Sequence, residues 1–252
     1  MIFQNREQAG QQLAEKLLAY RGRTDVIVLA IPRGGVPVAF EVARILKAPL
    51  DIFLSRKLGV PGQEELAFGA LASGGVRVLD RDLISELNLS RKEIDRIAEN
   101  VERELERREQ VYRGNRSPIR IEGKVALLVD DGIATGSSMR AAIKALRQKK
   151  PSRLVVAVPV ASLQACQKLR SEVDELVCVY APEYFYAIGQ FYEDFSQITD
   201  ETVSDLLRGA VESAGSSRPG SASAAAGDKS SRKSEPAGDA LNEIRTGRRG
   251  LE

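Results

Sequence analysis

The chain has 252 residues, 43% of them apolar, so it can bury one large core or two small ones. It contains no histidine, which excludes Ser-His-Asp and Cys-His nucleophile systems, histidine-based zinc sites and any histidine general base. Thirty-seven basic and thirty-five acidic residues give a net charge of +2, too balanced for a protein that binds nucleic acid or membranes over its whole surface. Its chemistry must therefore use carboxylates, lysines, arginines, hydroxyls, backbone amides or a metal held by oxygen atoms.

The cysteines and the N-terminal segment bear on the cellular compartment. Cys166 and Cys178 are too few for a four-ligand zinc site without histidine. The N-terminal segment carries charge throughout and has no uninterrupted apolar stretch, so we expect neither a signal peptide nor a membrane span. With no export signal, we expect both thiols to be reduced and the protein to be cytoplasmic.

Apolar runs alternate with helix-period segments through most of the chain. This pattern predicts an α/β fold with a central, parallel, twisted sheet and helices on both of its faces. The predicted strands are Val26–Ile31, Leu50–Leu54, Val125–Val129, Leu154–Val158 and Leu176–Val179, with a hairpin formed by Leu66–Ala72 and Val76–Leu79. The predicted helices between them are Ala9–Tyr20, Val36–Leu46, Ser137–Lys149 and Leu163–Arg170.

Glycines and a cation follow the first predicted strand. The segment Pro32, Arg33, Gly34 and Gly35 ends this strand and opens a helix. Its glycines permit close approach of a ligand to the backbone, and Arg33 supplies positive charge. A simple turn between strand and helix is the alternative interpretation.

The segment after the second strand, Ser55–Glu65, holds two adjacent cations, Arg56 and Lys57, together with two glycines. Such a composition at the carboxyl end of a strand favours a mobile loop that closes over an anionic leaving group. A solvated charged loop is the alternative. Glu64 and Glu65 are the carboxylates of this segment, which makes them the candidates for a general acid or base.

Residues 81–113 interrupt the alternation of strands and helices. They predict a short helix, a break at Asn88, and a capping box from Ser90 to Glu93 that opens a long charged helix. The narrow apolar stripe of this helix consists of Ile94, Ile97, Val101 and Leu105. Such stripes usually pack inward, so we expect a surface helix that lies on the core. A contact between copies of the chain, as in a homodimer, is the alternative.

The segment Leu127–Met139 is the most informative. It combines a buried strand, two adjacent carboxylates (Asp130 and Asp131), a glycine-bearing loop and the start of a helix. In open α/β sheets, ligands bind outside the carboxyl ends of the strands. The amides and hydroxyls of the loop suit a phosphate, whereas paired carboxylates would repel one and suit the hydroxyls of a sugar diol. The loop consists of Gly132, Ile133, Ala134, Thr135, Gly136, Ser137 and Ser138.

Other phosphate-binding patterns fail on spacing. A P-loop requires GxxxxGK[ST], but only three residues separate Gly132 from Gly136 and no lysine follows. A GxGxxG fingerprint is absent from this segment. A receiver domain can also show a strand that ends in Asp-Asp, but there the pair opens the domain. An aspartate-capped turn without function is the plain alternative. The thirteen residues Leu127–Met139 argue against it, because strand, acids, glycine loop and helix start occur together in this order.

Seven of the thirteen aromatic residues gather late in the chain, in the segment 180–197. They are Tyr180, Tyr184, Phe185, Tyr186, Phe191, Tyr192 and Phe195. Their clustering outside a periodic helix predicts a small hood that offers a stacking platform for a flat ring. An apolar lid over the core is the alternative.

After Glu212 the composition changes to serine, alanine, glycine and proline. Such a segment cannot bury enough apolar area to offset its ordering entropy, so we predict one domain over 1–212 and a disordered tail over 213–252. The tail carries seven basic and five acidic residues. This excess is small, and nucleic acid is therefore not an expected partner.

The segment Leu127–Met139 resembles the phosphoribosyl-pyrophosphate (PRPP) binding motif of type I phosphoribosyltransferases. In that family the acids that match Asp130 and Asp131 contact the ribose hydroxyls, and the loop that matches Thr135–Ser138 binds the 5′-phosphate. The resemblance covers most of residues 1–200 in element order, although only this motif is highly specific. It implies the family's fold, a parallel twisted sheet with helices on both faces, here with a helical insertion and a hood.

Three further segments are similar to parts of that family. Pro32–Gly35 is similar to its pyrophosphate loop, often the site of a strained peptide, so we predict a cis or otherwise unusual bond near Arg33 and Gly34. Ser55–Glu65 resembles a stretch of adenine phosphoribosyltransferases that contacts pyrophosphate. Pro182–Phe185 is similar to the base-binding segment of hypoxanthine-guanine phosphoribosyltransferases, which implies base binding by Phe185 and its neighbour Tyr186.

The resemblance implies a Mg²⁺-dependent transfer of 5-phosphoribose from PRPP to a nitrogenous base or related nucleophile, with release of pyrophosphate. Arg33, Arg56 and Lys57 would neutralise the pyrophosphate. Mg²⁺ would be held mainly by pyrophosphate and ribose oxygens, and Asp130 and Asp131 would reach it through the ribose hydroxyls.

One position departs from the hypoxanthine-guanine enzymes. They carry an aspartate that handles the purine ring proton, and Ala134 stands at its place here. The acceptor is therefore left open. A non-catalytic sensor of PRPP or nucleotides with the same fold is the alternative function.

Overall fold

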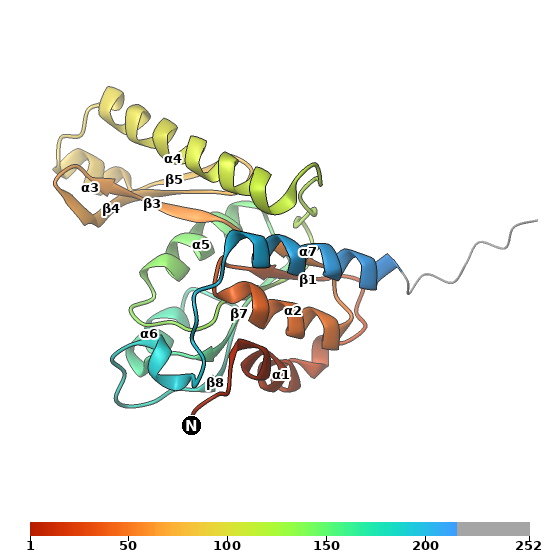
Figure 1. Ribbon diagram of the computed structural model, residues 1–252. Coiled ribbons are helices and arrows are strands. Elements are labelled where there is room, and N and C mark those ends of the chain that lie inside the picture. Colours follow the sequence, from red (N-terminus) through yellow and green to blue (C-terminus); the bar gives the residue numbers. More distant parts are fainter. Residues whose placement is uncertain (216–252) are drawn as a thin grey trace, which may run out of the picture. The chain divides into compact units, whose positions relative to one another are not determined.

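A parallel five-stranded sheet forms the centre of the computed structural model, which describes residues 1–215 (Figure 1). In spatial order its strands are β2 (Leu50–Ile52), β1 (Val26–Ala30), β6 (Val125–Val129), β7 (Arg153–Val160) and β8 (Glu175–Tyr180). β1 and β6 are buried along their whole length, which explains their unbroken apolar sequence. Ala30 pairs with Val129, so both strands end at one level and the loops that follow them lie side by side.

Helices cover both faces of the sheet, which confirms the predicted fold class. One face carries α1 (Arg6–Lys16), α2 (Gly35–Leu46) and α7 (Asp200–Gly215), and the other carries α5 (Ser137–Gln148) and α6 (Leu163–Leu169). The two-residue period of β1 divides its side chains between them: Val26 and Val28 face one core cluster, and Ile27 and Leu29 face the other. Short 3₁₀ turns lie at Leu18–Tyr20 and Ile188–Phe191.

A second, antiparallel sheet follows β2, and we call it the flap. It consists of β3 (Ser55–Val60), β4 (Gln63–Ala72) and β5 (Val76–Leu79). The hairpin of β4 and β5 is confirmed, but the expectation of a loop at Ser55–Glu65 is wrong. Leu58 and Val60 are buried at alternate positions, and this burial favours a strand that pairs with β4.

The helical insertion packs on the flap. It consists of α3 (Arg81–Glu86) and α4 (Arg91–Arg113), and the predicted capping box from Ser90 to Glu93 is present. Ile94 and Leu105 on the stripe of α4 are buried in one cluster with Leu58 of the flap. Figure 1 shows α4 running along this small sheet. The inward-packing interpretation of the stripe is confirmed, because the stripe packs into the same core cluster as the flap and α7.

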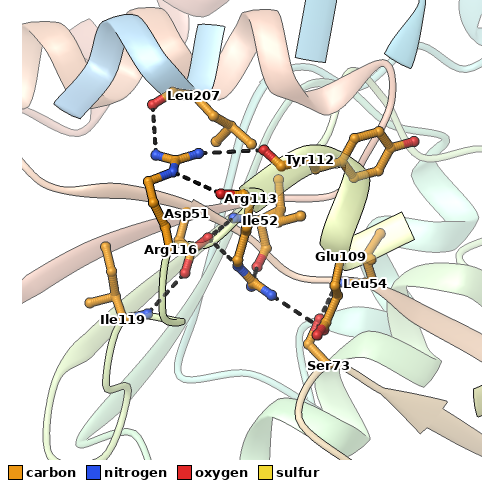
Figure 2. Close-up of polar contacts among 10 residues, drawn as sticks. All are labelled: Asp51, Ile52, Leu54, Ser73, Glu109, Tyr112, Arg113, Arg116, Ile119 and Leu207. Carbon is orange, nitrogen blue, oxygen red and sulfur yellow. Dashed lines mark hydrogen bonds and ion pairs between the residues drawn. The ribbon is translucent and has the colours of Figure 1, made fainter. Parts of the chain in front are cut away.

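A buried ion pair joins the C-terminal end of α4 to the central sheet (Figure 2). Arg113 Nε donates to Asp51 Oδ1 at 2.8 Å, and its Nη2 donates to the carbonyl oxygen of Ile52 at 2.7 Å. Asp51 Oδ2 accepts from the amide of Ile119 at 3.0 Å. At the base of the flap, the amide of Leu54 donates to Ser73 Oγ at 2.9 Å. Flap and insertion thus share one attachment region beside β2.

The last helix extends beyond the expected end of the domain. α7 continues to Gly215, three residues past Glu212. The rest of the predicted tail lies outside the described residues. Within residues 1–215, none of the helices is both long and apolar enough to cross a membrane.

Candidate active site

Two loops interlock at the carboxyl edge of the central sheet, one after β1 and one after β6. A Cβ atom on Gly34 would overlap Asp131 Oδ2 and lie 2.6 Å from Asp131 Cγ. A Cβ atom on Gly35 would lie 2.8 Å from Asp130 Cα. Only glycine fits at these positions, and the acidic pair therefore lies directly against the backbone of the first loop. The cis peptide bond of this loop joins Pro32 to Arg33, which confirms the prediction of a cis or unusual bond near Arg33 and Gly34.

Arg6 holds the second acid of the pair. Its Nε donates to Asp131 Oδ2 at 2.8 Å, and its Nη1 donates to the carbonyl oxygen of Ser196 at 2.9 Å. The guanidinium carbon lies 3.9 Å from the centre of the Phe195 ring. Arg6 is 8% exposed and Asp131 is 7% exposed, so this contact is well shielded from water.

Sequence reasoning missed Arg6, which lies 125 positions from its partner. One local signal was available. Arg6 opens α1, where the positive end of the helix dipole disfavours a cation. A buried arginine at such a position indicates a compensating tertiary contact, and Asp131 supplies it.

Burial dominates the electrostatics of the acidic pair. Desolvation, and then the charge of Asp131, raise the pKa of Asp130 well above its usual range. Desolvation also raises the pKa of Asp131, while the hydrogen bond and charge of Arg6 oppose this shift. Tyr192 Oη donates to the carbonyl oxygen of Asp131 at 2.6 Å. The pair is short of hydrogen-bond donors for two full negative charges, so hydroxyl donors from a ligand would suit it.

A cavity of about 350 Å³ opens at Asp131. Arg6, Arg33 and Gly34 line it together with Asp131 and the segment Phe195–Ile198. Asp131 is therefore buried against a ligand-sized space between the two loops, and not inside the apolar core. The volume is at the lower end of the range for small-molecule sites.

The first residues of the predicted phosphate loop have packing roles. A Cβ atom on Gly132 would lie 2.6 Å from Ile188 Cγ2, so the hood packs directly on this glycine. The amide of Ile133 donates to the carbonyl oxygen of Val160 at 2.9 Å. These two residues fix the loop to β7 and to the hood.

The second half of this loop is open to ligands. Thr135, Ser137 and Ser138 are exposed. Gly136 is the N-cap residue of α5, has a φ of 82° and gives the helix no side-chain cap. The first turn of α5 thus presents amides and hydroxyls of the kind that bind a phosphate group.

The two cations of the flap do not act together in this structure. Because they are neighbours on β3, Arg56 and Lys57 point to opposite faces of the small sheet. Arg56 Nη2 donates to Glu104 Oε1 of α4 at 2.5 Å. Lys57 lines a cleft of about 720 Å³ that Ser137 also lines. Lys57 is thus the flap cation that shares a space with the predicted phosphate loop.

Three further candidate residues, Arg33, Glu64 and Glu65, lie on two different segments. Arg33 Nη1 lies 3.7 Å from Asp200 Oδ1 at the start of α7. The backbone of Glu64 and Glu65 belongs to β4, and their side chains lie outside the described part of the chain.

The aromatic residues of the hood divide between a packed cluster and exposed positions. The rings of Phe185 and Phe191 lie 5.2 Å apart within an apolar cluster, and Tyr186 is 87% exposed. The cavity at the acidic pair is lined by Phe195, and neither Phe185 nor Tyr186 is among its lining residues. Most of the hood packs as an apolar lid.

The donor groups of the site suit a metal ion that arrives with its substrate. Among the side chains that the structure describes, no three from cysteine, aspartate or glutamate gather as a metal-binding cluster. Asp130 and Asp131 offer carboxylate oxygens, one of which already accepts from Arg6. Mg²⁺ retains waters and combines few carboxylates with phosphate oxygens, and such an ion fits this arrangement.

The fold and the site define a class of protein. The family model described as "Phosphoribosyl transferase domain" matches residues 1–196, and the chain belongs to this family. The resemblance drawn from the PRPP motif is thereby confirmed.

Individual relatives agree with this assignment. Two Mycobacterium tuberculosis proteins, from strains CDC 1551 / Oshkosh and ATCC 25618 / H37Rv, are each 43% identical over 206 residues. Their names describe phosphoribosyl transferases and mark the activity as unproven. The match covers 82% of this chain and 46% of theirs, so the chain spans about half their length. A crystal structure from Thermus thermophilus is 42% identical, with a TM-score of 0.75 over 82% of this chain and 98% of that chain.

Proposed function

We propose that the protein transfers 5-phosphoribose from PRPP to a nitrogenous base or related nucleophile and releases pyrophosphate, with Mg²⁺ as cofactor. The observation that carries this proposal is the interlocked pair of loops. The acids Asp130 and Asp131 lie against Gly34 and Gly35, and the open turn Thr135–Ser138 follows them on the same loop. PRPP is a ribose with phosphates at both ends. It therefore needs a turn for the 5′-phosphate, acceptors for the ribose hydroxyls and a loop for the diphosphate, all at the same edge of the sheet.

Each part of the donor then has a binding group. The amides and hydroxyls of Thr135–Ser138 bind the 5′-phosphate. Asp130 and Asp131 accept hydrogen bonds from the ribose hydroxyls, which supply the donors that the buried pair lacks. The backbone of Pro32–Gly35 and the charge of Arg33 hold the pyrophosphate.

The reaction breaks the bond from C1′ to the pyrophosphate oxygen and forms a bond from C1′ to the acceptor nitrogen. The electron pair of the broken bond leaves with pyrophosphate, and the ring passes through an oxocarbenium-like state. When bound, Mg²⁺ would neutralise charge on the leaving group, and Asp130 and Asp131 would help to hold it through the ribose hydroxyls. The chain contributes positioning and electrostatic stabilisation. Lys57 adds a cation from the flap, and Glu64 or Glu65 would take the acceptor's proton where one must leave.

We propose a nitrogenous nucleophile as the acceptor and leave its chemical identity open. Ala134 offers no carboxylate for a purine ring proton, and Phe185 and Tyr186 stay base-binding candidates if the hood moves on binding. The free thiols Cys166 and Cys178 suit the cytoplasm, which we propose as the compartment. A homodimer also stays a proposal.

A PRPP or nucleotide sensor is the second candidate, and the flap favours it. Arg56 is bound to Glu104, and Arg33 lies beside Asp200. A protein that only binds the donor has no need to direct these cations to a leaving group.

The test measures pyrophosphate release from Mg²⁺ and PRPP with a panel of purines, pyrimidines and small amines. Release with one acceptor, and its loss in Asp131→Asn with the fold retained, would support the transferase. Binding of PRPP without release against the whole panel would support the sensor. Absence of PRPP binding would contradict both functions.

A further inference from the structure

We infer that Arg6 is a specificity-determining residue for the sugar donor: it contacts the 1-diphosphate and makes the site select PRPP over ribose 5-phosphate. The inference rests on the proposed function, because it concerns how that donor is recognised. Arg6 belongs to α1 and lies outside all the motifs identified from the sequence above.

The cavity at Arg6 lies where the diphosphate must be. Gly34 and Arg33 line it from the proposed pyrophosphate loop, and Asp131 lines it from the proposed ribose site. In PRPP, C1′ connects the ribose to the diphosphate. With the ribose at Asp131 and the diphosphate at Gly34, the bond between them crosses the cavity that Arg6 also lines.

The guanidinium of Arg6 is held in place before any ligand binds. Asp131 and the carbonyl of Ser196 accept two of its hydrogen bonds, and the ring of Phe195 covers one of its faces. Among the described residues, no hydrogen-bond acceptor is found for Arg6 Nη2. A guanidinium has five donors in a rigid fork, so donors are left for an oxygen in the cavity.

Burial makes Arg6 the best shielded arginine near this space. The side chain of Arg6 is 9% exposed, whereas those of Arg33 and Arg56 are 39% and 45% exposed and face Asp200 and Glu104. Charge interactions weaken with exposure to water and salt, so a diphosphate gains most from the buried cation. Arg6 also neutralises Asp131, which would otherwise repel the diphosphate. Ribose 5-phosphate carries only a neutral hydroxyl at C1′, which gains much less from this cation than a diphosphate does.

The test compares ligands that share one half of PRPP. Calorimetry with Mg²⁺ present would give dissociation constants for PRPP, inorganic pyrophosphate and ribose 5-phosphate, in the full chain and in Arg6→Lys. Lysine keeps a cation for Asp131 but lacks the planar fork. We expect at least a tenfold loss of affinity for pyrophosphate and PRPP, and a change of less than twofold for ribose 5-phosphate.

Two further variants keep the test sharp. Phe195→Leu leaves Arg6 intact but removes the ring against its face, and should weaken pyrophosphate several-fold without affecting ribose 5-phosphate. This variant decides the question if Arg6→Lys does not fold. Arg23→Lys is the matched control, because Arg23 also pairs with an aspartate, Asp25, and lies over the ring of Tyr20. It should change none of the three constants.

The inference is overturned if Arg6→Lys leaves pyrophosphate affinity unchanged. It is also overturned if all three ligands weaken in parallel, because Arg6 would then act only by holding Asp131. Failure of the proposed function gives a different result: the unaltered chain would bind neither PRPP nor pyrophosphate.

Discussion

The carboxylate of Asp131 occupies the place where a side chain on Gly34 would begin. A Cβ atom there would lie 2.6 Å from Asp131 Cγ, closer than carbon atoms approach without a bond. The loop after β1 and the acidic pair after β6 are thus parts of one packed unit. A change in either loop must displace the other.

Gly34→Ala should therefore separate the two loops and weaken PRPP binding by at least tenfold, because Asp131 or the loop backbone must move. Calorimetric titration with PRPP would measure the effect. Gly209→Ala in α7 is the control: the nearest atom to its Cβ would be Phe40 Cε2 at 3.9 Å. In a helix this replacement should be neutral or stabilise the protein by up to about 1 kcal/mol. Equal PRPP affinity in both variants would contradict the interlocked arrangement.

Asp130→Asn should make the protein more stable at neutral pH. Burial and the charge of Asp131 raise the pKa of Asp130, so the folded protein binds this proton more tightly than the unfolded chain. The resulting stability is present below the usual aspartate pKa of about 4 and is lost as pH rises through the raised value. Asparagine removes that loss, because its amide carries no charge at any of these pH values.

Urea unfolding between pH 4.5 and 8 checks this prediction. The asparagine variant should be more stable than the original chain at pH 8, because the buried carboxylate of Asp130 loses its hydration on folding and a neutral amide loses far less. The difference should shrink toward pH 4.5. A variant that is less stable at every pH would show that Asp130 is well solvated in the folded state.

Local patterns predicted the sheet and the motif well. The unbroken apolar runs of β1 and β6 report burial on both faces, and the capping box from Ser90 to Glu93 is a contact between neighbours in the chain. Such features depend on residues that are close in sequence. They can be predicted without knowing the tertiary arrangement.

Residues whose roles depend on distant partners could not be predicted in this way. A cation at the start of a helix hints at a distant partner, but the sequence around Arg6 does not reveal that Asp131 and Phe195 are its contacts. Arg56 and Lys57 look like one positive group in the sequence, but strand geometry directs them to opposite faces. The sequence signal for that strand was the pair of apolar residues Leu58 and Val60 at alternate positions.

Asp51→Ala should destabilise the protein by about 3–5 kcal/mol, because it leaves the buried cation of Arg113 without its main partner (Figure 2). Denaturant unfolding would measure the loss. Asp95→Ala is the control: Asp95 pairs with Arg77 at the surface, where such pairs contribute at most about 1 kcal/mol. Similar losses in both variants would mean that the buried network does not secure the insertion.

Glu104→Gln should release Arg56 from α4 and raise the affinity for pyrophosphate about two- to fivefold, if this cation serves the proposed leaving group. Both side chains of the pair are more than one-third exposed, so the stability loss should be at most about 1 kcal/mol. Arg56 also lowers the pKa of Glu104, so the small stabilisation by the pair disappears as pH falls through that lowered value.

Calorimetric titration with pyrophosphate and Mg²⁺ separates this effect from a change in overall charge. Glu99→Gln removes the same charge from an exposed position of α4 and should leave the affinity unchanged. If Glu104→Gln binds pyrophosphate no better than Glu99→Gln, Arg56 has no part in holding the leaving group. Its contact with Glu104 would then serve only to fix the flap on α4, an outcome that the sensor function also allows.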